Sequence, residues 1–215
     1  MNNSCEYIHI LFNSCEKNNF PFDLKKIPKN GIYILFENGE FAHSTNRIVR
    51  IGTHTGNNNL PHRLKEHFLN ENKDRSIFRK NIGRALLNKN NDPFIQYWEL
   101  DLTAKKIKDK YSKVIDIEKQ RCIEKEITKY IQNNFSFILL EINDKNKRLL
   151  LESKIISTVS LCNECSQSEK WLGNYSTVEK IKKSGLWLVN GLWKIPLNND
   201  DLNDIECMLK NGIKR

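Results

Sequence analysis

Long hydrophobic runs are missing from this chain of 215 residues. No run approaches the roughly 18 apolar residues that a membrane helix needs, so we expect no membrane span. The first residues also lack a basic leader and a small-residue cleavage site, which argues against a secretion signal and for a cytoplasmic location. Proline and glycine are scarce, at 5 and 9 residues, and no linker or internal repeat divides the chain. We therefore expect one domain with small additions.

Acidic residues are outnumbered, with 26 Asp and Glu against 35 Lys and Arg, which gives a net charge of +9. Because basic side chains displace counterions from a phosphate backbone, this excess favours a nucleic-acid partner. Charges of both signs are interspersed along the chain, so solubility alone is the alternative explanation.

Metal-binding patterns are also sparse among the cysteines, which stand at positions 5, 15, 122, 162, 165 and 207. Only Cys162 and Cys165 have the spacing of a ligand pair, and no second pair or nearby His-x-His motif completes a zinc site. We interpret all six cysteines as reduced thiols. Zinc binding at Cys162 and Cys165 is the alternative.

The spacing of apolar residues predicts strands first and then helices with strands between them. Helices are expected at residues 6–17, 60–70, 76–88, 115–133 and 147–161, and strands at residues 31–36, 47–51, 93–100 and 135–142. Asn38-Gly39 is a turn signal that would join the first two strands as a hairpin. This order is typical of a small α+β domain.

Glu152 is the first residue that suggests chemistry, because it interrupts an apolar helical stripe. Leu149, Ile155, Ile156 and Val159 lie on the same predicted helix face. A buried carboxylate is costly unless it is paired or binds a metal. The alternative is that Glu152 lies at the edge of the stripe and its carboxylate reaches water.

Arg63, His67 and Tyr33 are the other candidates. Arg63 and His67 share a helix face at i and i+4, which aims a cation and a proton-transfer group in one direction. A phosphoryl-transfer site needs such a cation for the charge on the phosphate oxygens, although the pair is also common on solvated helices. Tyr33 lies in an apolar strand, where most tyrosines are core residues with a partnered hydroxyl.

In their order, these residues resemble the GIY-YIG nuclease family. Gly31-Ile32-Tyr33 matches the first signature, and Arg50-Ile51-Gly52 stands where the second belongs. Residues 60–68 are similar to the family's helix that bears an arginine and a following histidine, and residues 151–156 are similar to its metal-binding helix. Asn163 matches the asparagine that often follows the glutamate. The resemblance covers residues 31–163.

The resemblance implies an α+β fold with a small core, whose central, mainly antiparallel three-stranded sheet is flanked by helices. The core would span residues 31–165, with an insertion near 101–134 that small members lack. Residues 1–30 would form an N-terminal extension, and residues 166–215 a C-terminal extension that packs on the core.

The resemblance also implies a metal-dependent endonuclease that hydrolyses phosphodiester bonds of double-stranded DNA. Glu152 would hold Mg²⁺ (or Mn²⁺), Tyr33 would take a proton from the attacking water, and Arg63 would neutralise the phosphorane. His67 would relay a proton or orient Tyr33. Asn163 would orient the phosphate or the glutamate, with Asn174 as the second choice.

Two features depart from the family pattern. Arg50 replaces the signature tyrosine, and its guanidinium stays protonated, which leaves it phosphate binding or support of the Tyr33 phenolate. The insertion resembles those of the family's restriction endonucleases, so by analogy we expect a type II restriction enzyme that cuts both strands as a homodimer. A DNA repair or mobile-element nuclease is one alternative. A catalytically inactive DNA-binding module is the other.

Several residues are left without a role in chemistry. His43, His54 and His62 are interpreted as surface or loop histidines, with His54 the strongest outsider because it follows the second signature. The tryptophans at 171, 187 and 193 could stack on bases, but core packing is the favoured interpretation.

Overall fold

The structure, a computed structural model, describes residues 4–103, 105–111 and 114–212. Its centre is a four-stranded sheet whose order is β1, β4, β2, β3, with every neighbouring pair antiparallel. The strands are β1 (Asn18–Asn19), β2 (Gly31–Ala42), β3 (Thr45–Gly52) and β4 (Phe135–Glu141). The predicted α+β class with a mainly antiparallel sheet is confirmed, and the two-residue β1 is the strand that the sequence did not indicate.

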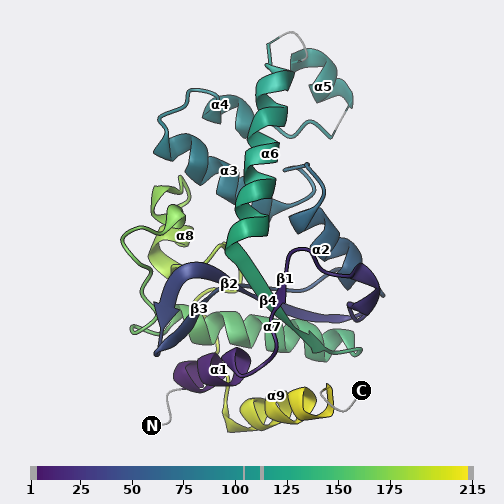
Figure 1. The fold of residues 1–215 in the computed structure, drawn as a ribbon, viewed down its shortest axis with the longest axis vertical. Coiled ribbons are helices and arrows are strands. Elements are labelled where there is room, and N and C mark those ends of the chain that lie inside the picture. Colours follow the sequence, from purple (N-terminus) through teal and green to yellow (C-terminus); the bar gives the residue numbers. More distant parts are fainter. Residues whose placement is uncertain (1–3, 104, 112–113, 213–215) are drawn as a thin grey trace.

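Helices cover both faces of the sheet (Figure 1). One face packs against α1 (Ser4–Asn13), α7 (Lys145–Ser160) and α9 (Asn199–Gly212), and the other against α2 (Leu60–Phe68), α3 (Ile77–Lys89) and α6 (Ile117–Asn134). The shorter helices are η1 (Leu24–Lys26), α4 (Ile95–Trp98), α5 (Lys105–Tyr111), η2 (Leu172–Tyr175) and α8 (Glu179–Ser184). Among the residues described, no helix is long and apolar enough to cross a membrane.

The alternation of side chains along β2 separates two cores. Ile32, Ile34 and Phe36 point into the core beneath α1 and α7, whereas Tyr33 and Leu35 point into the core shared with α2, α3 and α6. Because both faces are covered, β2 is buried continuously from Gly31 to Glu37. Tyr33 therefore lies on the face of the sheet that α2, α3 and α6 cover.

The predicted turn at Asn38-Gly39 is wrong. Strand β2 continues to Ala42, and the chain reverses at His43 and Ser44, whose φ angles of 48° and 56° are those of a two-residue hairpin turn. Gly39 has a φ of 85° within the stretch between Phe36 and Phe41, where the strand register shifts. Two-residue hairpin turns and some bulges contain a residue with positive φ, so the Asn-Gly pair is compatible with either.

The predicted strand at residues 93–100 is also wrong, because this segment forms the short helix α4. Phe94 and Trp98, four residues apart, are both buried. The Trp98 indole N–H donates to the Lys80 carbonyl at 3.0 Å, and its ring lies so close to Gly83 that a Cβ there would be 2.4 Å from it. Packing against α3 thus overrides the local preference of an aromatic-rich segment for a strand.

The remaining predicted elements are confirmed, with bounds shifted by a few residues. Helix α6 ends at Asn134 and β4 begins at Phe135, so the helix leads directly into the sheet (Figure 1). Part of the predicted insertion, at residues 104, 112 and 113, lies outside the described residues. Trp171 and Trp187 are buried and both donate to the Glu37 carboxyl, as expected for core packing, whereas Trp193 is 43% exposed.

Candidate active site

The two signature segments lie side by side on neighbouring strands. In the β2–β3 hairpin, Tyr33 is opposite Gly52 and Leu35 is opposite Arg50. Directly opposed residues share a face, so Arg50 lies diagonally from Tyr33 on the same side of the sheet. The next pair is Phe36 with Ile48, so the register skips Val49. This bulge in β3 turns both Val49 and Arg50 toward the face that carries Tyr33.

Gly52 allows the Tyr33 ring to lie across β3. A Cβ at residue 52 would be 2.3 Å from the Tyr33 hydroxyl oxygen and 2.5 Å from the ring carbon that bears it. Every other residue type would displace the phenol. The glycine of the second signature therefore has a steric role in placing the tyrosine of the first.

The Tyr33 hydroxyl contacts the buried side chain of His67. Its oxygen lies 2.8 Å from His67 Nε2, and His67 Nδ1 lies 2.7 Å from Ser76 Oγ, the N-cap of α3. Burial lowers the pKa of His67 well below its usual value, and the nearby Arg63, Arg50 and Arg79 lower it further. A neutral His67 with its hydrogen on Nδ1 leaves Nε2 to accept the Tyr33 proton.

Arg50 is fixed next to the hydroxyl. Its Nε–H donates to the Tyr33 oxygen at 3.3 Å, and its Nη1 donates to the Trp187 carbonyl. The guanidinium also lies over the Phe78 ring, 5.0 Å from its centroid, and Arg50 is only 4% exposed. Since a guanidinium has five N–H donors, donors remain for a ligand in the pocket.

Arg63 reaches the site from α2, on the helix face that it shares with His67 as predicted. Its Nη1 donates to the Glu66 carboxylate at 3.2 Å and to the Arg75 carbonyl at 3.1 Å. Its side chain is 22% exposed, whereas His67 is fully buried. The arginine thus faces the pocket, and the histidine supports Tyr33 from within the core.

Glu152 enters from α7, on the other side of Tyr33. One of its oxygens accepts the Thr53 N–H at 2.9 Å. Burial raises the pKa of Glu152, against the opposing effects of the Thr53 hydrogen bond, Arg50, Arg148 and Arg63. The apolar stripe around it differs from the prediction in one position, since Leu149 is 41% exposed and Leu151 is buried instead.

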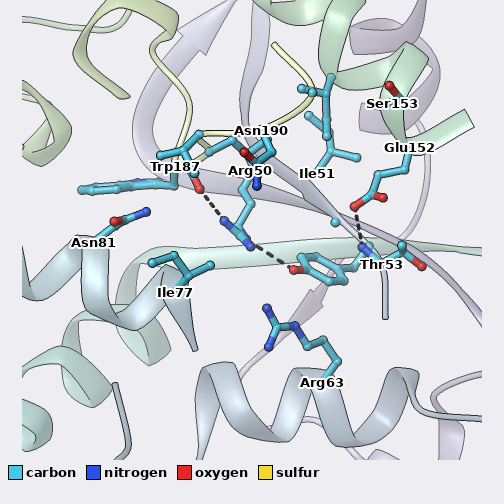
Figure 2. A pocket seen from close by; sticks show the side chains of 16 residues that line it. Arg50, Ile51, Thr53, Arg63, Ile77, Asn81, Glu152, Ser153, Trp187 and Asn190 are labelled. Carbon is cyan, nitrogen blue, oxygen red and sulfur yellow. Dashed lines mark hydrogen bonds between the residues drawn. The ribbon is translucent and has the colours of Figure 1, made fainter. Parts of the chain in front are cut away.

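These side chains meet in one cavity of about 230 Å³. Tyr33, Arg50, Arg63 and Glu152 all line it, and Glu152 is the acidic member of its described lining. In Figure 2, Arg63 rises from one helix and Glu152 descends from another, and Arg50 lies to one side of them, next to Trp187. Two cations and one carboxylate around a phenol hydroxyl fit a phosphodiester accompanied by a divalent cation.

The structure does not bring Asn163 to this cavity. Helix α7 ends at Ser160, and Asn163 is an exposed residue in the turn beyond it. From Glu152 to the end of α7 at Ser160 the helix rises roughly 12 Å at 1.5 Å per residue, and Asn163 is not among the residues that line the cavity. Asn174 is not a lining residue either, because its amide donates to the carbonyls of Ser168 and Glu169.

Two other asparagines line the cavity, Asn81 from α3 and Asn190 from the C-terminal segment (Figure 2). Asn81 is 1% exposed, and its Nδ2 has no hydrogen-bond partner among the described residues. Its Oδ1 accepts from Arg84 Nη1 at 2.6 Å, which fixes the amide orientation. No sequence signal distinguished these two among the many asparagines of the chain.

The C-terminal segment forms a wall of the cavity. The Trp187 N–H donates to the Val49 carbonyl at 2.8 Å, which fastens the segment to β3. The cavity lining then continues through Leu188, Val189, Asn190 and Gly191. Residues far beyond the last motif therefore complete the site.

A family model described as GIY-YIG domain matches residues 16–212. The chain belongs to the GIY-YIG family. No curated protein and no solved structure matches the chain. The GIY-YIG domain indicates a family of nucleases. The match extends well beyond residues 31–163, so the segments before β2 and after α7 belong to the same domain model.

GIY-YIG nucleases generally depend on a divalent metal, and the donor chemistry of this cavity fits one. A carboxylate has about four acceptor sites, so Glu152 keeps acceptors beyond the one that binds Thr53. Mg²⁺ is commonly held by one or two carboxylates together with waters and substrate phosphate. The burial that raises the pKa of Glu152 is a cost that a bound cation would offset.

His54, the strongest outsider among the histidines, is buried and takes no place in the cavity lining. Its Nε2 accepts the Gly31 N–H at 3.4 Å, and burial lowers its pKa. His62 is exposed on α2 and pairs with Glu66 at 3.3 Å, as expected of a surface histidine.

Proposed function

We propose that this GIY-YIG protein is a sequence-specific type II restriction endonuclease that uses Mg²⁺ (or Mn²⁺) to hydrolyse double-stranded DNA. The observation that carries the proposal is the single cavity in which Tyr33, Arg50, Arg63 and Glu152 meet. A phosphodiester hydrolase needs a base for the water, cations for the growing phosphate charge and a ligand for a metal. An inactive DNA-binding module would gain nothing from a carboxylate as costly to bury as Glu152.

Tyr33 is the base in this proposal, with His67 as its positioning residue. The Tyr33 hydroxyl passes its proton to His67 Nε2, 2.8 Å away, and the resulting phenolate accepts from the Arg50 Nε–H. The phenolate then takes a proton from the water that attacks phosphorus. The bond from phosphorus to the 3′ oxygen breaks, that oxygen takes a proton from solvent, and His67 passes its proton back through Tyr33 to solvent.

The arginines supply the charge that this step needs. Arg63 neutralises the phosphorane, and Arg50 contacts a phosphate oxygen with its remaining N–H groups. The unpartnered Asn81 Nδ2 donates to the same phosphate and takes the orienting role expected of Asn163. When bound at Glu152, the divalent cation polarises the scissile phosphate and stabilises the leaving 3′ oxygen.

Restriction requires cleavage of both strands at one short sequence, and one protomer offers one such cavity. A two-fold dimer places one cavity on each strand of a palindrome. The excess of basic residues supplies the salt-sensitive part of DNA binding. The insertion at 101–134, whose helix α6 extends away from the sheet in Figure 1, supplies base contacts.

The test is digestion of supercoiled plasmid DNA with Mg²⁺ over a range of enzyme concentrations. We expect discrete fragments with fixed ends and a rate that rises faster than linearly with enzyme concentration. Random fragments, or nicks confined to flaps and branched junctions, would overturn the restriction role and favour a DNA repair or mobile-element nuclease. The absence of cleavage with either Mg²⁺ or Mn²⁺ would rule out the proposed nuclease activity and favour a catalytically inactive DNA-binding module.

A further inference from the structure

A second group of potential metal ligands lies on the face of the sheet opposite Tyr33. Cys5 and His9 come from α1, His43 from the β2–β3 turn and Cys165 from the segment after α7. One ligand atom from each residue lies within 4.8 Å of the others. Cys5, His9 and Cys165 are buried, and the His43 side chain is 2% exposed.

The distances between these atoms fit a tetrahedral zinc ion. With Zn–S bonds of about 2.3 Å and Zn–N bonds of about 2.0–2.1 Å, a regular tetrahedron separates two sulfurs by about 3.8 Å and a sulfur from a nitrogen by about 3.5 Å. The sulfurs of Cys5 and Cys165 are 3.3 Å apart. Cys165 Sγ is 3.3 Å from His43 Nε2 and 3.7 Å from His9 Nε2. The donors therefore already surround a centre of the right size.

Both histidines are oriented as zinc ligands usually are. A metal-binding histidine normally donates its other ring N–H to a carbonyl or carboxylate, which fixes the tautomer. His9 Nδ1 lies 2.8 Å from the Cys5 carbonyl oxygen, and His43 Nδ1 lies 3.5 Å from the Glu164 carboxylate. In both rings this leaves Nε2 for the metal. His9 Nε2 now accepts the Ile48 N–H at 3.2 Å, and a metal would take that lone pair.

A disulfide between Cys5 and Cys165 is the competing explanation for the close sulfurs. Their separation of 3.3 Å is far longer than an S–S bond of about 2.05 Å. A disulfide would also leave two histidines facing the bond without a reason for their orientation. The four donors together match the Cys₂His₂ set of structural zinc sites.

We propose that Cys5, His9, His43 and Cys165 bind a structural zinc ion. Four protein ligands leave no open position for a substrate, so the ion has no part in cleavage. It joins the first helix to the turn of the hairpin that carries Tyr33 and Arg50, and to the end of the helix that carries Glu152. Cys162, whose sulfur is 3.5 Å from His43 Nε2, lies beside the cluster and is not one of the four ligands.

The six cysteines are free thiols as interpreted from sequence, and the proposed site differs from the alternative drawn there in pairing Cys165 with Cys5 and not with Cys162. The His43 side chain is in the hairpin turn but is buried, unlike that of a surface histidine. Spacing could not reveal the proposed site, because the hairpin and α7 bring together ligands that are as much as 160 residues apart.

Metal analysis of the purified full-length chain tests the proposal. We expect about one zinc ion per chain, retained after dialysis against Mg²⁺ and lost on treatment with a strong zinc chelator. The melting temperature should fall with the zinc and return when Zn²⁺, but not Mg²⁺, is restored. Replacing zinc by Co²⁺ should give the visible absorption of a tetrahedral thiolate site, which needs no variant to fold.

Variants separate this site from the active site. Cys165→Ser should lose the zinc, whereas Cys122→Ser, at an exposed cysteine on α6, should keep it. Glu152→Gln should also keep it, because the proposed catalytic ligand lies elsewhere. A wild-type chain without zinc that takes up neither Zn²⁺ nor Co²⁺ would overturn the proposal. An intact mass lower by two hydrogens in a zinc-free chain would overturn it in favour of the disulfide.

Discussion

Replacing Tyr33 by Phe removes one oxygen from the centre of the active site and keeps the ring. The change leaves His67 Nε2, in a fully buried side chain, without the partner that now lies 2.8 Å away. An unsatisfied buried acceptor costs about 1–3 kcal/mol. Arg50 also loses a bond, but it lines the cavity and water can replace the hydroxyl there. We therefore expect the free energy of unfolding to fall by about 1–3 kcal/mol.

The effect on rate should be much larger than the effect on folding. Loss of a general base lowers a rate by about 10²–10⁴-fold. Urea denaturation gives the free energy of unfolding, and initial rates of plasmid cleavage in Mg²⁺ give the activity. Both are measured where each variant is fully folded.

Tyr130→Phe is the matched control. The Tyr130 hydroxyl donates to the buried Glu37 carboxyl, and neither residue lines the cavity. Its loss costs about 1.5–3 kcal/mol if the acceptor is charged, similar to the cost at Tyr33. We expect Tyr130→Phe to be destabilised and still active. If Tyr33→Phe cleaves within about tenfold of wild type, roughly 1.4 kcal/mol of barrier, Tyr33 is not the base.

Four further outcomes test the remaining roles. Glu152→Gln should abolish cleavage and raise the free energy of unfolding in metal-free buffer. The raised pKa of Glu152 means that the folded state holds the ionised carboxylate poorly. Activity of the variant in Mg²⁺ near that of wild type would exclude Glu152 as the metal ligand. Because the pKa of Glu152 is raised, the acid limb of the wild-type pH–rate profile should lie above the ordinary titration range of glutamate. The limb should move to lower pH as the Mg²⁺ concentration is raised. A limb that does not change with Mg²⁺ would show that Glu152 does not bind the metal. Asn81→Ala should slow cleavage while Asn163→Ala leaves it unchanged, and the reverse would restore the role expected from sequence. Arg50→Tyr should be slower, because the Tyr33 oxygen loses the N–H that it accepts and the bound phosphate loses a cation. A rate near wild type would place Arg50 outside the chemistry.

The sequence predicted the parts of the site that depend on local patterns. Tyr33, Arg63 and Glu152 each stand out against a short periodic background, and their side chains do reach one cavity. The contact of His67 with Tyr33 was expected from the family resemblance, while its spacing from Arg63 predicted only the shared helix face. Strand and helix periods fix which face a side chain takes, so such residues can be found without knowing the packing.

The parts that failed depend on contacts between distant segments. The segment 93–100 has an aromatic composition that favours a strand, and only its packing on Gly83 makes it helical. The wall at residues 187–191 is placed by hydrogen bonds of Trp187 to Val49, Arg50 and Glu37, all more than 130 residues away in sequence. The expected role of Asn163 failed because a fixed spacing after Glu152 does not tell where α7 ends.

In the proposed mechanism, phosphate binding and proton transfer to His67 place opposite demands on the charge of the cavity. Arg50 and Arg63 bind phosphate in this mechanism, yet the same charges lower the pKa of His67, the proposed acceptor of the Tyr33 proton. The lowered pKa of His67 makes it a poor proton acceptor in the free protein. A phosphodiester bound between the two arginines cancels part of their field, so His67 becomes more basic only when DNA is present. Burial, the largest cause of the lowered pKa, stays in place, so a bound phosphate makes proton transfer to His67 less unfavourable without charging His67 in the free protein.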